Sequence, residues 1–188
     1  ESLAKEAKVQ LGRISTLLAC ADSVDAEDLG TFVAPKFTCG QLRPTKLEDV
    51  FRDRAIVVRR SGNSLMDDPV DSFRGPQGLA EALNGLADAL QRERNVRVKF
   101  KVVRIEPSST SIRTSAYYEA SSRTPRRTVQ QNAVWDARWR RSSEDESLRL
   151  VSVRVHDFEE VVVHCASQTL FADCTEAVLG ANAAYRDQ

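Results

Sequence analysis

The sequence predicts an α+β domain in which a strongly curved antiparallel sheet packs against about three helices. Four long segments between residues 95 and 158 alternate apolar and polar side chains, and short polar connections separate them. This pattern is typical of antiparallel hairpins with one buried face and one wet face. Helical segments precede the strands, so the two kinds of element are segregated along the chain. The 188 residues suffice for one domain with a substantial core.

The two longer predicted helices each carry one apolar stripe at the three-to-four spacing of a buried helical face. The first spans residues 3–21, and the other begins after the turn sequence at residues 75–78. The stripe residues are Ala7, Leu11, Ile14, Leu18 and Ala21 in the first, and Leu79, Leu83, Leu86 and Leu90 in the other. We expect both helices to lie with this side against the sheet.

The segments between these helices are less regular. A short helix is predicted over residues 26–33, and Pro35 is expected to end it. Residues 36–44 are predicted to be irregular. Residues 47–60 are interpreted as a short helix that leads into a strand.

The four late strands are predicted from strict alternation. Trp135 and Trp139 are four residues apart, so both indoles point to the same face. The predicted inward rows are Val96, Val98, Phe100 and Val102; Ile112, Thr114, Ala116, Tyr118 and Ala120; Val129, Gln131, Ala133, Trp135, Ala137 and Trp139; and Val151, Val153, Val155 and Asp157.

Charge and composition exclude some classes of function. The 27 basic and 27 acidic side chains balance, which argues against a dedicated nucleic-acid binder, since such a protein needs a basic excess. No apolar run approaches the length of a membrane span. The histidine and cysteine spacing matches no zinc motif. The turn at residues 75–78 has neither the lysine nor the glycine spacing of a nucleotide-binding loop, and no metal or other cofactor is expected.

Four cysteines are present, and none forms a CxxC pair. The first interpretation is that they are free, buried thiols. The alternative is one disulfide, either Cys165–Cys174 or Cys20–Cys39.

The chain resembles the nuclear transport factor 2-like superfamily, whose small bacterial members are often called SnoaL-like. The residues that carry the resemblance are the long first helix, the segment 25–37, the sequence 73–79 before the third helix, and the strand with Trp135 and Trp139. The resemblance implies a cone-like domain over residues 1–163, with a hollow at its wide end.

Residues 164–188 are interpreted as a C-terminal extension or linker helix. Residues 169–188 resemble the stretch that joins such a domain to a β-propeller in large FG-GAP/ASPIC-UnbV-type bacterial proteins. The chain begins at Glu1, which suggests either removal of a signal peptide or excision from a longer protein. A secreted or periplasmic location is the corresponding expectation.

The resemblance implies acid–base groups on the concave face of the sheet. Strand parity places Tyr118, Gln131 and Asp157 there, with Trp135 and Trp139 as walls. Asp157 would be a general base whose charged form is disfavoured by burial, and Tyr118 would donate to an oxyanion. Gln131 and the two tryptophans would hold the ligand. The simpler alternative is that Tyr118 and Gln131 are satisfied core groups and that Asp157 lies in water.

Two further groups of polar residues are expected to face outward. His156 shares its row with Ser152 and Arg154, which predicts contact with solvent or with another subunit. Six arginines are predicted to gather at neighbouring strand ends, as a solvated rim or an anion site. They are Arg123, Arg126, Arg127, Arg138, Arg140 and Arg141.

Three functional hypotheses follow. The first is a non-catalytic domain that binds a small hydrophobic ligand or docks a partner within a larger protein, with a homodimer through the outer sheet face. The second is a cofactor-free isomerase, dehydratase or cyclase that acts on a hydrophobic carbonyl compound. The third is a filled core without any cavity.

Overall fold

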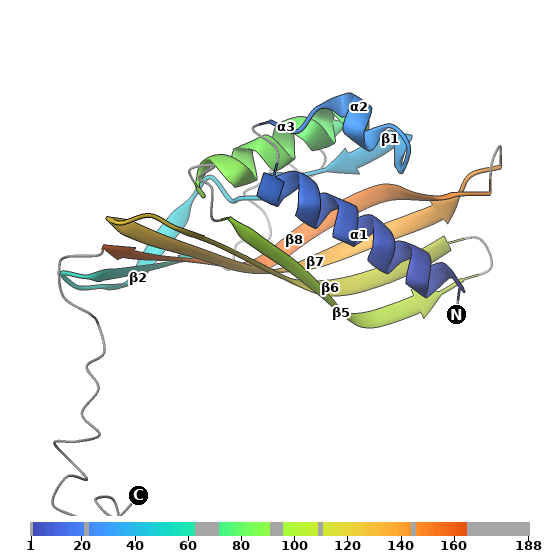
Figure 1. Cartoon of the computed structure of the whole chain (residues 1–188). Coiled ribbons are helices and arrows are strands. Elements are labelled where there is room, and N and C mark those ends of the chain that lie inside the picture. Colours follow the sequence, from blue (N-terminus) through green and yellow to red (C-terminus); the bar gives the residue numbers. More distant parts are fainter. Residues whose placement is uncertain are drawn as a thin grey trace, which may run out of the picture.

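The computed structural model describes residues 2–20, 23–62, 72–90, 96–108, 111–143 and 146–164. The described helices and strands form the α+β arrangement predicted from the sequence, with a curved sheet and helices on one of its faces (Figure 1). In chain order they are α1 (Ser2–Cys20), α2 (Ala26–Leu29), β1 (Val33–Cys39), β2 (Leu47–Arg52), β3 (Ile56–Ser61), β4 (Phe73–Arg74), α3 (Gly75–Asp88), β5 (Arg97–Pro107), β6 (Ser111–Arg123), β7 (Arg127–Arg141) and β8 (Leu148–His164).

One sheet contains all the described strands, in the order β2-β3-β8-β7-β6-β5; β1 also pairs with β8, and β4 pairs with β1. The strands β5 to β8 pair antiparallel through hairpins, as their alternating sequence predicts. The long strand β8 pairs with two different strands along the edge that faces away from β7. Its first half pairs parallel with β1 and its second half pairs antiparallel with β3.

An irregularity in β8 lies between these two halves. Asn132 of β7 is opposite Glu159, but Val134 is opposite His156, so β8 holds one residue more than β7 in this interval. Asp157 there adopts a left-handed conformation with φ of 53°. Such a β-bulge bends the strand and shifts its alternation by one residue. As a result, Phe158 points inward in place of Asp157.

The two early strands β1 and β2 correct the sequence prediction. Residues 33–39 form a strand where a helix end and an irregular segment were predicted, because β8 supplies its backbone partners. Residues 47–52 form a strand and not a short helix. The strand β2 lies at the sheet edge with five of its six residues exposed, so it shows no apolar alternation from which it could be recognised.

The helices α1 and α3 confirm the predicted stripes as far as they are described; Ala21 of the first stripe lies outside the described residues. The other stripe residues are buried against the inner face of the sheet, and the opposite, outer face carries no described helix (Figure 1). Gly78 of α3 allows a close approach to β4, since a Cβ there would lie 2.7 Å from the carbonyl carbon of Phe73. None of the described helices is long and apolar enough to span a membrane.

Candidate functional site

The four predicted site residues on β6 and β7 converge on the inner face of the sheet. Tyr118, Gln131, Trp135 and Trp139 are at most 1% exposed, so no water-sized space adjoins them. Phe100 of β5 packs edge-on against Trp135, with ring centroids 4.9 Å apart, and the Tyr118 ring stacks on the same indole at 5.5 Å. The sequence therefore identified a real aromatic cluster, and in this structure its centre is filled.

A chain of hydrogen bonds leads out of this cluster. The Tyr118 hydroxyl donates to Gln131 Oε1 over 3.1 Å, and Gln131 Nε2 donates to Glu160 Oε2 over 3.2 Å. Burial, together with the nearby charge of Glu160, raises the pKa of Tyr118. Tyr118 is therefore a neutral donor that is already engaged by Gln131.

The two indoles differ in their polar contacts. Trp139 Nε1 donates to Thr114 Oγ1 over 2.9 Å. Trp135 Nε1 is buried and has no hydrogen-bond partner within the described ranges. A buried donor without a partner is unfavourable, so Trp135 carries the one unsatisfied polar atom in the aromatic cluster.

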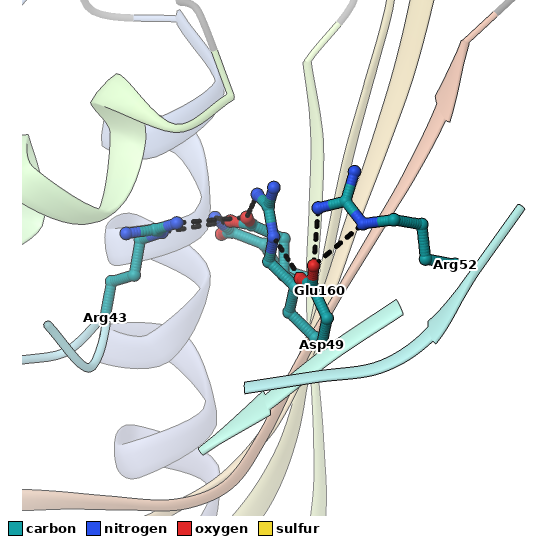
Figure 2. Close-up of polar contacts among 6 residues, drawn as sticks. Arg43, Asp49, Arg52 and Glu160 are labelled. Carbon is teal, nitrogen blue, oxygen red and sulfur yellow. Dashed lines mark hydrogen bonds and ion pairs between the residues drawn. The ribbon is translucent and has the colours of Figure 1, made fainter. Parts of the chain in front are cut away.

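Glu160 is the residue that the sequence analysis missed. It is 1% exposed, and it is the only buried charged side chain among the described residues. Arg43 donates from Nε and from a terminal nitrogen to its two carboxylate oxygens, over 2.9 and 3.0 Å, and Arg59 lies 3.5 Å away (Figure 2). Arg43 follows β1 and Arg59 lies on β3, so three separate parts of the chain meet at this carboxylate.

The ionised form of Glu160 is the stable one. Burial opposes ionisation, but the hydrogen bonds and charge of Arg43, the Gln131 amide and the charge of Arg59 outweigh it, so the pKa of Glu160 is lowered. A general base that works near neutral pH needs a raised pKa instead. This carboxylate therefore holds structure together and is poorly suited to accept a proton.

The ion pairs continue outward to the sheet edge. Arg59 Nε donates to Asp49 of β2 over 3.1 Å, and Arg52 of the same strand also binds Asp49 (Figure 2). The hydrogen bonds from Arg52 and Arg59 lower the pKa of Asp49. Three guanidiniums and two carboxylates thus form one network that ties the edge hairpin β2–β3 to the core.

The prediction that Asp157 faces the concave side is wrong. Its side chain is 78% exposed and lies 2.9 Å from His156 Nδ1, on the outer face. The cause is the β-bulge described above, which inverts the alternation after His156. The apolar residues Phe158 and Val162 on either side of Glu160 were the available sign that the inward row continues through residue 160.

His156 faces outward, as its row predicted. Its Nε2 lies 3.2 Å from Asp136 Oδ2, and Ser115 donates to the other oxygen of Asp136 over 2.6 Å. The imidazole thus lies between the carboxylates of Asp136 and Asp157. No described group of histidine, cysteine and acidic side chains has the arrangement of a metal site.

The prediction that six arginines gather at neighbouring strand ends is wrong. Arg123 pairs with Thr128 beside the β6–β7 turn, whereas Arg140 pairs with Ser111 and Arg149 at the opposite end of β7. The six residues are therefore divided between two ends of the sheet. The sequence alone could not reveal this separation, because residues that are close in the sequence can lie at the two opposite ends of one long strand, here β7.

Of the predicted disulfides, the Cys20–Cys39 pair is not formed. Cys20 is an exposed free thiol at the end of α1, and Cys39 is buried in the core. Cys165 and Cys174 lie outside the described residues.

Comparisons with known proteins define the fold. No family model matches the sequence, and no curated protein matches it either. Among solved structures, the chain is similar to LinA, with a TM-score of 0.54 and 10% identity, covering 91% of this chain and 96% of LinA. A hexachlorocyclohexane dehydrochlorinase, LinA-type3 from Novosphingobium barchaimii, gives a TM-score of 0.53 at 10% identity, covering 91% of this chain and 97% of that one.

A further similar structure is an NTF2-like family protein from Streptomyces avermitilis, a dehydratase candidate, with a TM-score of 0.52 and 11% identity. The match covers 83% of this chain and 96% of that one. At such low identity these matches establish the arrangement of the chain and leave the chemistry open. The chain has the nuclear transport factor 2-like fold.

Proposed function

We propose that this chain is a non-catalytic binding domain that docks a protein partner and acts within a larger protein. The observation that carries the proposal is the state of Glu160. The only buried charged group of the described core is held ionised by Arg43 and Arg59. Its neighbours Gln131 and Tyr118 are engaged in the same hydrogen-bond chain, so this cluster offers no free base and no free acid.

The alternative of a cofactor-free isomerase or dehydratase finds less support. Two of the similar structures are named as a dehydrochlorinase and a dehydratase candidate, but those names describe those proteins. In this chain the expected base Asp157 lies on the outer face in water. A carboxylate there lacks the apolar surroundings of a desolvated base and has no contact with Tyr118 or the tryptophans.

The outer face of the sheet supports a docking function. It is uncovered by the described helices (Figure 1). Tyr117, in the middle of β6, is 53% exposed. Tyr117 is directly opposite Val134, which is itself opposite His156, so an aromatic, an aliphatic and an imidazole side chain form one row. Exposed aromatic residues of this kind are enriched at protein interfaces.

A second copy of the chain is the partner that we propose first for this row. Light scattering of the wild-type protein and of Tyr117→Arg tests it. We expect a dimer for the wild type and a monomer for the variant, because a charge at the centre of a two-fold interface would face its own copy. Arg97→Glu, on β5 away from the row, is the control. A wild type that stays monomeric at high concentration contradicts the homodimer.

A small hydrophobic ligand remains the second candidate, and one observation favours it. The Nε1 of Trp135, which has no partner among the described residues, would donate a hydrogen bond to a ligand carbonyl placed in the aromatic cluster. Such a ligand requires the core to open, since Trp135 is fully buried. The two indole N–H signals of Trp135 and Trp139 in a nitrogen–proton NMR spectrum distinguish the candidates.

Cyclohexanone is a suitable probe for this experiment. The docking proposal predicts that neither indole N–H signal shows a chemical-shift change that saturates as cyclohexanone is added. A saturable shift of the Trp135 signal alone, abolished in Trp135→Phe, would support the ligand-binding candidate and weaken the filled core on which our proposal rests.

The larger protein is part of the same proposal. Residues 169–188, outside the described ranges, resemble the segment that leads to a propeller in FG-GAP/ASPIC-UnbV-type proteins. Sequencing the gene on both sides of this segment tests the proposal. A reading frame that continues into propeller repeats would support it, and a stop codon directly after Gln188 would contradict it.

A further inference from the structure

The sheet register brings together arginines that are far apart in the sequence. Arg113 of β6 is directly opposite Arg138 of β7, and Arg140 of β7 is directly opposite Arg149 of β8. Residues opposite each other in antiparallel strands point to the same face. The residues that alternate with them are buried on the inner face, among them Ile112, Trp139 and Leu150, so these arginines lie on the outer face. Arg154 of β8 is diagonal to Arg138 on this face.

We name Arg113, Arg138, Arg140, Arg149 and Arg154 the arginine patch. Like charges directly opposite each other on two strands are destabilising, and this patch contains two such pairs. Arg113, Arg138, Arg140 and Arg154 form no ion pair with any other described residue. Two carboxylates border the patch: Glu106 is directly opposite Arg113, and Asp136 is directly opposite Arg154. The contacts of Glu106 go to Arg104, and those of Asp136 go to Ser115 and His156.

We propose that the arginine patch binds a short acidic segment of a partner protein. Guanidinium groups bind carboxylates in a bidentate, charge-assisted way, and several carboxylates on an extended segment would relieve both repulsive pairs at once. The inference rests on the docking function proposed above and names the chemistry of a partner. It is independent of the homodimer, which involves the row of Tyr117.

The extent of the patch favours an acidic protein segment over nucleic acid. The patch occupies one end of the outer face, and the same face carries acidic residues farther along, namely Glu119, Asp157 and Glu159. A nucleic acid that crossed the face would meet these carboxylates, and the zero net charge of the chain supplies no long-range attraction to it. A segment with three or four carboxylates fits the patch without reaching them.

Fluorescence anisotropy with a labelled peptide tests the proposal. The probe is a peptide in which glutamate and serine alternate, and the variants are Arg113→Gln with Arg138→Gln. The matched control is Lys99→Gln with Lys101→Gln, which removes the same charge from the outer face of β5. We expect the patch variant to weaken binding roughly tenfold and the control variant less than about twofold, with binding of the wild type weakened by added salt.

The same titrations define the outcomes that overturn the proposal. Single-stranded DNA of equal charge is titrated in parallel. Tighter binding of the DNA, weakened by the patch variant, would make the patch a nucleic-acid site and overturn the proposal. So would equal weakening by both variants, or absence of peptide binding.

Urea unfolding of the patch variant checks that the two substitutions leave the chain folded. Removing both members of the Arg113–Arg138 contact should leave its midpoint equal to or above that of the wild type. A lower midpoint would contradict the repulsion on which the proposal rests. The light-scattering result for Tyr117→Arg is unaffected by any of these outcomes, so failure of the acidic segment and failure of the homodimer are distinguishable.

Discussion

Arg43 binds both carboxylate oxygens of Glu160, over 2.9 and 3.0 Å, although 117 positions separate the two residues in the sequence. The contact joins the segment after β1 to the second half of β8. Glu160 also accepts from Gln131 and lies beside Arg59 of β3. Through these contacts, Glu160 connects the inner face of the sheet to the edge hairpin β2–β3. The buried charge of Glu160 therefore has a structural role.

Replacing Arg43 should destabilise the fold markedly. In Arg43→Met, Glu160 keeps its burial but loses the partner that binds both oxygens, and an uncompensated buried charge typically costs about 3 kcal/mol or more. The free energy of unfolding in urea measures the effect. Arg60→Met is the matched control, because its ion pair with Glu159 is exposed and should contribute less than about 1 kcal/mol. Equal effects of the two substitutions would contradict the structural role of Arg43.

The stability that Glu160 contributes should depend on pH. Its pKa is lower in the folded chain than in the unfolded one, so the contribution is fully present above the unfolded pKa and is lost as the pH falls through the folded pKa. Urea unfolding of the wild type and of Glu160→Gln should therefore differ most near neutral pH and converge in acid. A difference that grows as the pH falls would contradict the lowered pKa.

The left-handed backbone of Asp157 in β8 predicts that a glycine at this position is more stable than an alanine. Asp157 has φ of 53°, which glycine adopts without strain and alanine adopts at a cost of about 1 kcal/mol. Asp157→Gly and Asp157→Ala both remove the contact with His156, so they differ only in the backbone. Thermal or urea unfolding should find the glycine variant more stable by about that amount. A more stable alanine variant would mean that the bulge is absent.

The two tryptophans should respond differently to phenylalanine. Trp139→Phe leaves Thr114 Oγ1 without its donor, whereas Trp135→Phe removes a buried N–H that has no partner among the described residues. Both substitutions lose comparable apolar area, so Trp139→Phe should be the more destabilising by about 1 kcal/mol. The comparison uses unfolding free energies. A larger loss for Trp135→Phe would show that its indole nitrogen is satisfied after all.

Two glycines of α3 test the packing of the helix. A Cβ at Gly78 would lie 2.7 Å from the Phe73 backbone, whereas a Cβ at Gly85 meets nothing within 4 Å. Gly85→Ala should stabilise the chain by up to about 1 kcal/mol through helix propensity, and Gly78→Ala should destabilise it. Unfolding midpoints of the two variants provide the measurement. A neutral Gly78→Ala would place α3 farther from β4 than the structure has it.

The sequence predicted the parts of the fold that carry a regular pattern. Both longer helices and the strands β6 and β7 follow their apolar periodicity, because one face of each is buried. The strand β5 follows it only as far as Val102, with a half-buried inner face. The strand β2 was missed because it is an exposed edge strand, and β1 because its partner β8 is more than a hundred positions away. Whether such segments form strands depends on pairing with neighbouring strands and not on local propensity.

The candidate site was predicted only as far as the regular strands reach. Tyr118, Gln131, Trp135 and Trp139 were placed correctly on the inner face, since β6 and β7 keep strict alternation there. Asp157 was misplaced by the single extra residue of the β-bulge, and the same shift concealed Glu160. Nor does the sequence show that Arg43 lies near that carboxylate, because this contact exists only once the sheet is assembled.

The most direct test of a non-catalytic interior is the titration of one carboxyl group. Carbon-13 NMR of the Glu160 side chain, assigned by its loss in Glu160→Gln, gives its pKa. We predict a value below the ordinary 4.5 of a glutamate, as expected for a carboxylate neutralised by Arg43 and Arg59. A carboxyl group at residue 160 that titrates near neutral pH would be fit for general base catalysis, and it would contradict the account.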